Sequence, residues 1–168
     1  MATNAVADAS LLLTLGDAGV LDLLWDDQRH RWHVTPIVRG EIRSEPTRTG
    51  IANAILNGRL VGAEIDTRSG AELAELARWS RMVDAGEAEV IAIGVSRGWI
   101  VGIEDLFAQR KLTAARGTAA WINAATLLLH AVQDRRLRMT EADRIFQRLD
   151  CYAGDVKRGV KSLTALGP

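Results

Sequence analysis

Acidic residues stand at four places along the chain, each beside a short apolar segment. These acids are Asp8 at the end of "NAVAD", Glu41 in "PIVRGE", Glu87 at the start of "GEAEVIAIGVSRG", and Glu104 and Asp105 after "WIVGI". Carboxylates that meet in one place raise one another's pKa unless a cation lies among them. Their oxygen atoms suit Mg²⁺ or Mn²⁺, and such an ion activates water for in-line displacement at phosphorus. If the acids converge, the sequence predicts a metal-dependent phosphodiesterase.

The elements that must position these acids alternate between strands and helices. Apolar or alternating segments predict strands at 4–8, 31–35, 59–65 and 99–103, and helical spacing of apolar residues fills the segments between them. This order predicts an α/β fold with a mainly parallel sheet. "PIVRGEIRSE" is expected to be one helix ending before Pro46. After about residue 118 the pattern predicts helices only, at 118–134 and 140–150, with a weaker one in "AGDVKRGVKSLTAL".

Parallel strands place their carboxyl ends at one edge of the sheet, where ligands bind in α/β proteins. Asp8, Glu104 and Asp105 end strands, and Glu41 lies in the second turn of the helix that follows strand 31–35. Glu87 joins them only if its helix lies alongside the sheet with its first turn at the crevice. Periodicity does not decide that orientation.

Each acid also has a structural explanation that needs no ligand. Asp8 can cap the helix that begins beside it, and the Glu104–Asp105 pair can cap a helix at 105–116. Glu87 can complement a helix dipole, and Glu41 can be a solvated residue on a helix face. Both interpretations stay open at the level of the sequence.

Composition indicates one globular domain. The 168 residues are 48% hydrophobic and 25% charged, and 21 basic residues balance 21 acidic ones, so net charge favours no partner. The single cysteine, Cys151, excludes an internal disulfide and fits a reducing cytoplasm. The N-terminal segment does not read as a signal peptide. We find no run of 18 apolar residues that would span a membrane, and no phosphate-binding loop or paired cysteines.

The ordered set of acidic motifs resembles the PIN-domain ribonucleases, the class that includes the VapC-like toxins of bacterial toxin–antitoxin pairs. The resemblance rests on "VADASLLLTLGDAGVLDLL", "VTPIVRGEI", "GEAEVIAIGVSRG" and the acid after "WIVGI". It covers a core of about 4–117. Residues from about 118 to 168 are then expected to form a helical C-terminal extension of the same single domain, 1–168.

The resemblance implies a three-layer α/β/α sandwich, commonly a homodimer, that binds Mg²⁺ or Mn²⁺ and hydrolyses RNA. Asp8, Glu41, Glu87 and Asp105 match the catalytic acids of the family. Asp8, Glu87 and Asp105 would hold the metal, and Glu41 would complete the cage and orient or deprotonate the attacking water. A small antitoxin protein is the partner that the resemblance implies. Whether the substrate is RNA, DNA or another phosphodiester is not determined by these residues.

The fourth acid departs from the family pattern, because this chain has "EDLFAQR" where relatives often show "DDxxAR". Either Glu104 or Asp105 could be the metal ligand, and the spacing to Arg110 favours Asp105. A carboxylate misplaced by about 1 Å can cost roughly 100-fold in rate. The alternative function is therefore a weak or inactive PIN-fold protein that acts as a binding or regulatory partner.

Secondary contacts to the substrate are open to two interpretations. Ser10 could touch a metal-bound water or cap a helix. Arg110, with Arg39 or Arg43, could contact the scissile phosphate or be a plain surface arginine. In "DDQRHRWH", at 26–33, His30 and His33 could form a metal-binding pair, but a solvated loop that enters a strand is favoured. "DRRLRM", at 134–139, is the most basic segment and could follow an RNA backbone.

Overall fold

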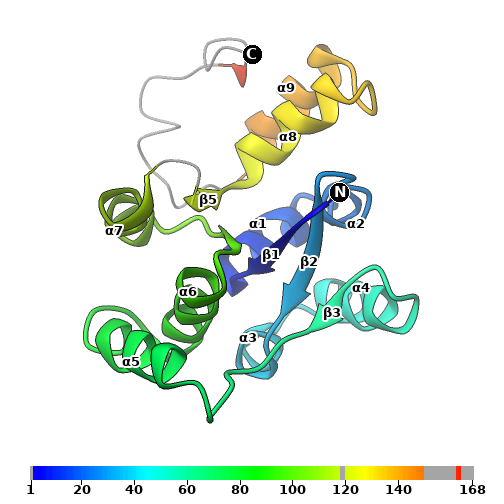
Figure 1. Cartoon of the computed structure of the whole chain (residues 1–168). Helices are drawn as coiled ribbons and strands as arrows, with labels where there is room; N and C mark the ends of the chain where they lie inside the picture. The colour runs from blue at the N-terminus through cyan, green and yellow to red at the C-terminus, as the bar shows by residue number, and fades with distance from the viewer. Residues whose placement is uncertain (1, 118–119, 150–161, 164–168) are drawn as a thin grey trace.

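A parallel sheet of five strands forms the centre of the computed structural model, which describes residues 2–117, 120–149 and 162–163. The strand order is β3-β2-β1-β4-β5 (Figure 1), and every neighbouring pair is parallel. The strands are β1 Thr3–Ala7, β2 His30–Val34, β3 Val61–Gly62, β4 Ile100–Gly102 and β5 Trp121–Ile122.

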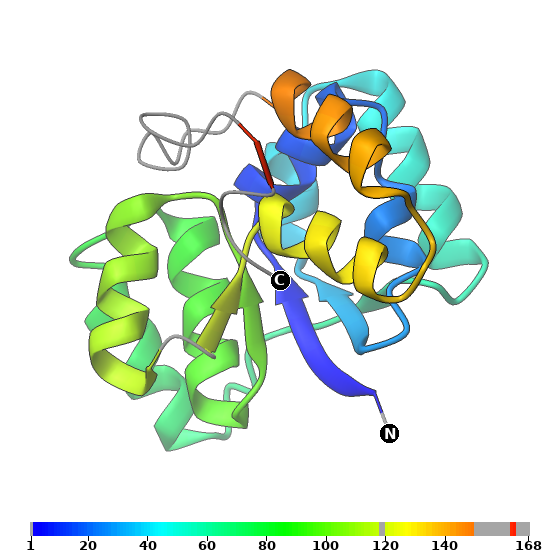
Figure 2. The same ribbon diagram turned by 90° about the horizontal axis from the view of Figure 1, so that it is seen from above.

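Helices cover both faces of this sheet. They are α1 Ala9–Asp17, α2 Asp22–Trp25, α3 Pro36–Glu41, α4 Glu45–Leu56, α5 Gly70–Trp79, α6 Ala85–Arg97, α7 Leu106–Arg116, α8 Ala124–Gln133 and α9 Met139–Arg148. Figure 2 shows α5, α6 and α7 on one side of the sheet and α1, α4, α8 and α9 on the other. The predicted three-layer α/β/α architecture with a parallel sheet is confirmed. No helix in the described ranges is long and apolar enough to cross a membrane.

The central strands are apolar on both faces because both faces are covered. Ala5, Val6 and Ala7 of β1 have no exposed surface. Helix α6 packs tightly on the sheet at Gly94, where an added Cβ would lie 2.4 Å from Cγ2 of Val101 in β4. A side chain at Gly94 would push the helix away, so this glycine permits the close approach. The first turn of α6, which carries Glu87, lies at the carboxyl edge of the sheet.

The chain after residue 118 was expected to form helices only, and this prediction was wrong. Trp121 and Ile122 form β5, which pairs with Val101 and Gly102 of β4, and the sheet therefore extends beyond the predicted core of 4–117. Asn123 then caps α8 by accepting a 3.0 Å hydrogen bond from the Thr126 N–H. A strand of two residues is too short to show a periodicity of its own. The helical spacing of the residues after it therefore led to the prediction of one helix over the whole segment.

Two smaller expectations also change. "PIVRGEIRSE" is not one helix, because the backbone becomes extended at Ile42 and a second helix, α4, begins at Glu45. The strand expected at 59–65 is reduced to Val61–Gly62. The weaker helix expected in "AGDVKRGVKSLTAL" lies almost wholly outside the described residues, as does Cys151.

Candidate active site

A pocket of about 370 Å³ opens at the carboxyl edge of β1 and β4. Asp8, Ala9, Ser10, Leu13, Glu41, Asp84, Glu87 and Asp105 line it, and we call it the acidic pocket. The four acids that matched the family pattern, with Asp105 as the fourth, therefore lie together. Neither lysine nor arginine is among the lining residues.

Asp8 both caps a helix and faces the acidic pocket. It directly follows β1, and its backbone N–H donates a 2.8 Å hydrogen bond to the Gly102 carbonyl of β4. Its Oδ2 accepts hydrogen bonds from the Ser10 N–H at 2.9 Å and the Ser10 hydroxyl at 2.5 Å. Asp8 is thus the N-cap of α1, as the sequence suggested. The same hydrogen bonds hold its carboxylate at the acidic pocket.

Asp105 combines the same two roles. It is the N-cap of α7, and its Oδ1 accepts a 2.8 Å hydrogen bond from the Ala108 N–H. Asp105 also lines the acidic pocket. An N-cap aspartate with one committed oxygen can still offer its second oxygen to a ligand.

Glu87 and Glu41 reach the acidic pocket from two further helices. Glu87 lies in the first turn of α6, where its N–H donates a 2.9 Å hydrogen bond to Oδ1 of Asp84. Glu41 is the last residue of α3, and its carboxylate lies over Gly86, where an added Cβ would be 2.3 Å from Oε1. The question that periodicity left open is thus answered, because α6 does begin at the crevice.

Burial and mutual repulsion raise the pKa of three of these carboxyl groups. Burial is the main cause at Asp8, where the hydrogen bonds from Ser10 oppose it. Burial also raises the pKa of Glu41, with Asp84 and Asp8 adding to the effect. The pKa of Glu87 rises to about 8, first through burial and then through the charges of Asp8 and Asp105. A site that resists ionisation of its own carboxyl groups favours a bound cation.

Glu104 does not line the acidic pocket. It is fully buried, and its Oε1 accepts a 2.6 Å hydrogen bond from the backbone N–H of Ala124 at the start of α8. Burial raises the pKa of Glu104 to about 7. Its own N–H donates a 3.1 Å hydrogen bond to the Ser10 hydroxyl. Of the two candidates for the fourth acid, Asp105 lines the acidic pocket, and Glu104 instead contacts the start of α8.

The sequence reasoning missed one acid, Asp84. This residue is exposed, lines the acidic pocket, and is the N-cap of α6. An aspartate three residues before a helical glutamate is a recognisable start signal for a helix. The segment "DAGE" carried that signal, and the same geometry that caps the helix brings Asp84 beside Glu87.

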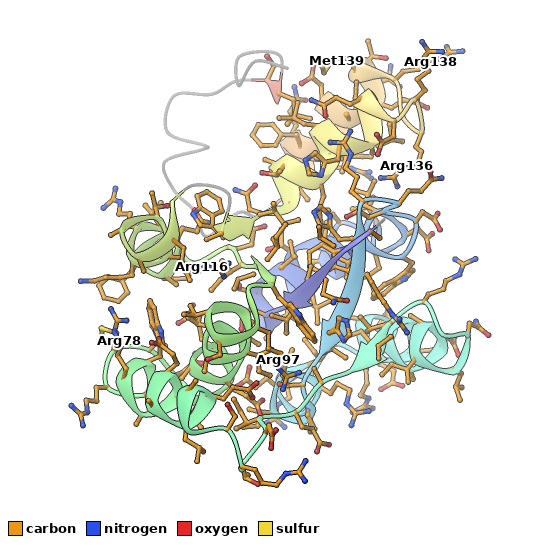
Figure 3. All side chains as sticks on the ribbon, viewed as in Figure 1. Arg78, Arg97, Arg116, Arg136, Arg138 and Met139 are labelled. Atoms are coloured by element: carbon orange, nitrogen blue, oxygen red, sulfur yellow. The ribbon has the colours of Figure 1, made fainter. Side chains whose placement is uncertain are left out.

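The arginines expected at the phosphate lie outside the acidic pocket. Arg39, Arg43 and Arg110 are exposed, and none of them lines it. Arg39 lies instead at a separate hollow between α3 and α4. Figure 3 shows Arg136 and Arg138, from the basic segment 134–139, beyond the amino-terminal ends of β1 and β2. That segment therefore lies away from the edge that carries the acids.

Comparison with known proteins adds support for the fold. No protein-family model matches the chain, and no curated protein matches it significantly. Among solved structures, that of PAE2754 from Pyrobaculum aerophilum is similar, with a TM-score of 0.53 and 18% sequence identity. The match covers 79% of this chain and 100% of that chain. At this identity the likeness concerns the fold alone.

The donor set of the acidic pocket fits a hard divalent cation. Its charged lining consists of carboxylates, and Ser10 adds a hydroxyl. Oxygen-only sites of this kind suit Mg²⁺ or Mn²⁺ better than thiol- or imidazole-binding metals. Asp8, Glu87 and Asp105 supply carboxylate oxygens to this pocket, and Asp84 and Glu41 add two more carboxylates to its lining.

Proposed function

We propose that the chain is a metal-dependent endoribonuclease of the PIN-domain type. The observation that supports it is the convergence of acids from four separate segments, Asp8, Glu41, Glu87 and Asp105, on one pocket. These are the four positions at which the sequence resembles that family. A pocket lined by carboxylates would repel a phosphodiester unless a cation compensates for its charge, so Mg²⁺ or Mn²⁺ belongs to the proposal.

Each residue of the acidic pocket has a separate role in the proposed reaction. When bound, a divalent ion would supply positive charge for the phosphoryl oxygens and lower the pKa of the attacking water. Asp8, Glu87 and Asp105 would hold that ion, directly or through water. Glu41 would orient the attacking water and accept its proton as the new P–O bond forms, while the ribose oxygen leaves and takes a proton from solvent water. Ser10 fixes the orientation of the Asp8 carboxylate.

The biological setting is proposed from the resemblance. VapC-like chains act as toxins, so we propose a cytoplasmic toxin of a toxin–antitoxin pair. Its partners would be an RNA substrate, a small antitoxin protein and a second copy of the chain in a homodimer.

Cleavage of RNA oligonucleotides with and without Mn²⁺ tests this function. We expect cleavage that requires Mn²⁺, stops with EDTA, and falls by at least about 100-fold in Asp8→Asn. Asp17→Asn is the matched control, because it makes the same change at an exposed position of α1 and should leave the rate unchanged. A DNA oligonucleotide of the same sequence separates ribonuclease from general nuclease activity.

Two results would count against the proposal. Cleavage that survives both Asp8→Asn and EDTA would remove the acids from the mechanism. Mn²⁺ binding without cleavage of any nucleic acid would instead favour the inactive PIN-fold protein that binds or regulates a partner.

A further inference from the structure

A second group of metal-ligating side chains lies at the opposite end of the strands. Asp27 is in the turn that follows α2, His30 is the first residue of β2, and His130 lies in the last turn of α8. One carboxylate oxygen and one ring nitrogen from each histidine all lie within 4.8 Å of one another. We call these three residues the Asp–His–His cluster.

Asp27 is held in a fixed orientation by hydrogen bonds. It is buried, and its Oδ2 accepts a 3.1 Å hydrogen bond from the indole N–H of Trp32, which is itself buried. Its Oδ1 accepts a 3.0 Å hydrogen bond from the Arg29 N–H. The Nδ1 of His30 lies 2.6 Å from Oδ2. Outer hydrogen bonds of this kind orient the carboxylate of a metal ligand and are a regular part of metal sites.

His130 supplies the observation that points to a ligand. Within the described part of the chain its Nδ1 is buried and has no hydrogen-bond partner. Its ring stacks on that of His30, with 5.8 Å between ring centroids and 23° between the planes. A buried polar nitrogen without a partner costs free energy that a coordinated cation would recover.

Surrounding contacts fix the distance between the two elements that carry the histidines. The guanidinium of Arg29, next to His30, binds the carboxylate of Asp134 just after α8 with N–O distances of 2.6 and 3.1 Å. At the other end of α8, Glu104 holds the Ala124 N–H. The helix is therefore anchored at both ends, and the Asp–His–His cluster lies at its C-terminal anchor.

We propose that Asp27, His30 and His130 bind a divalent transition-metal ion of the Zn²⁺ class and thereby clamp α8 to the start of β2. Two imidazoles and one carboxylate are a donor set that Zn²⁺ accepts, with a fourth position left for water. Imidazole ligands favour Zn²⁺ over Mg²⁺, so this site differs in chemistry from the acidic pocket. If the ion binds between His30 and Asp27, it displaces the proton of their hydrogen bond, and that proton is released to the solvent.

The sequence offered a different histidine pair. His33, which the spacing placed with His30, takes part in other contacts: its Nε2 lies 3.1 Å from Oδ1 of Asn4, and its ring lies 4.3 Å from that of Trp99. His30 instead meets His130, which comes from a distant part of the chain. His33 therefore serves as an internal control.

Calorimetric titration of the metal-free chain with Zn²⁺ tests the proposal. We expect one Zn²⁺ per chain with micromolar or tighter affinity in the wild type, in Asp8→Asn and in His33→Gln. His130→Gln should weaken binding by roughly 100-fold or more. His130→Cys, which keeps a metal-ligating atom, should retain the site. Zn²⁺ should also raise the Tm of Asp8→Asn and leave that of the double variant Asp8→Asn/His130→Gln unchanged.

The Asp8→Asn background separates this proposal from the nuclease proposal, because it disables the acidic pocket alone. Failure of Zn²⁺ to bind the wild type, or equal binding by wild type and His130→Gln, would overturn the Zn²⁺ site. Loss of binding in a folded His130→Cys would overturn it as well. Folding of each variant is checked by far-UV circular dichroism and Tm in EDTA.

Discussion

The carboxylate of Glu41 lies directly over Gly86, so that a Cβ at Gly86 would be 2.3 Å from Oε1 and 2.6 Å from Oε2. This contact brings the end of α3 onto the first turn of α6, and the Gly86 backbone N–H hydrogen-bonds to Glu41. A glycine at this position lets the carboxylate approach the helix N-terminus, where the dipole favours negative charge. Gly86 is thus part of what positions Glu41 in the acidic pocket.

Gly86→Ala should displace Glu41 and spare the fold. The methyl group meets the end of a flexible side chain, which can move away, and alanine in a helix gains about 0.5–1 kcal/mol over glycine. We expect Mn²⁺ affinity or RNA cleavage to fall about 10-fold or more while Tm is unchanged or slightly higher. Gly40→Ala is the control, because a Cβ there meets nothing within 4 Å. Equal activity in both variants would show that Glu41 has no part in the site.

Substitutions of Glu104 and of Asp105 should have different effects on Mn²⁺ binding and on stability. Asp105→Asn should abolish Mn²⁺ binding, since Asp105 lines the acidic pocket. Glu104→Gln should retain it, because the amide oxygen can still accept the Ala124 N–H. Glu104→Ala leaves that N–H without a partner and should cost about 1–3 kcal/mol in the free energy of unfolding. Calorimetry and urea unfolding measure the two effects, and loss of Mn²⁺ binding in Glu104→Gln would reverse the assignment.

Asp84 should contribute to metal affinity independently of its capping role. Asn is as good an N-cap as Asp, so Asp84→Asn should keep the hydrogen bond to the Glu87 N–H and leave Tm nearly unchanged. Mn²⁺ affinity should fall several-fold as one negative charge leaves the pocket. Asp84→Ala removes the cap too and should cost about 1 kcal/mol of stability. Unchanged Mn²⁺ affinity in Asp84→Asn would limit Asp84 to a structural role.

Stability without metal should fall as the pH rises from about 4.5 to about 8. Glu87 has a folded-state pKa of about 8 against an ordinary 4.5, so the folded chain holds this proton more tightly than the unfolded chain. The stabilisation is complete below about pH 4.5 and is lost as the pH rises through about 8. Between about pH 5 and pH 9 in EDTA, we expect wild type to lose on the order of 3 kcal/mol more than Glu87→Gln.

Urea unfolding at each pH measures this loss, and Glu64→Gln, an exposed glutamate, should behave like wild type. Added Mn²⁺ should restore the stability of wild type at alkaline pH, because a cation takes over the role of the proton. A pH profile of Glu87→Gln that matches wild type would mean that Glu87 is not the group responsible.

Local sequence patterns were sufficient to predict the layers of the fold and the place of most of the acids that line the acidic pocket. Short apolar segments between helical ones predicted the parallel sheet, because strands covered on both faces are continuously apolar. Asp8 follows β1, and the carboxyl ends of parallel strands share one edge, so its place could be predicted. The capping and site interpretations, which competed in the sequence, turn out to be compatible at Asp8 and Asp105.

Tertiary structure decided which way side chains point and which residues far apart in the sequence come into contact. Neighbouring residues in an extended segment point to opposite sides, so only the backbone path after β4 sends Glu104 toward α8 and Asp105 into the acidic pocket. Strand β5 exists because β4 offers it a partner. His30 meets His130 because α8 packs back against α2, which comes shortly before β2, a contact that no local spacing encodes. The sequence by itself determined which groups are available, and the packing of helices on the sheet decided which of them meet.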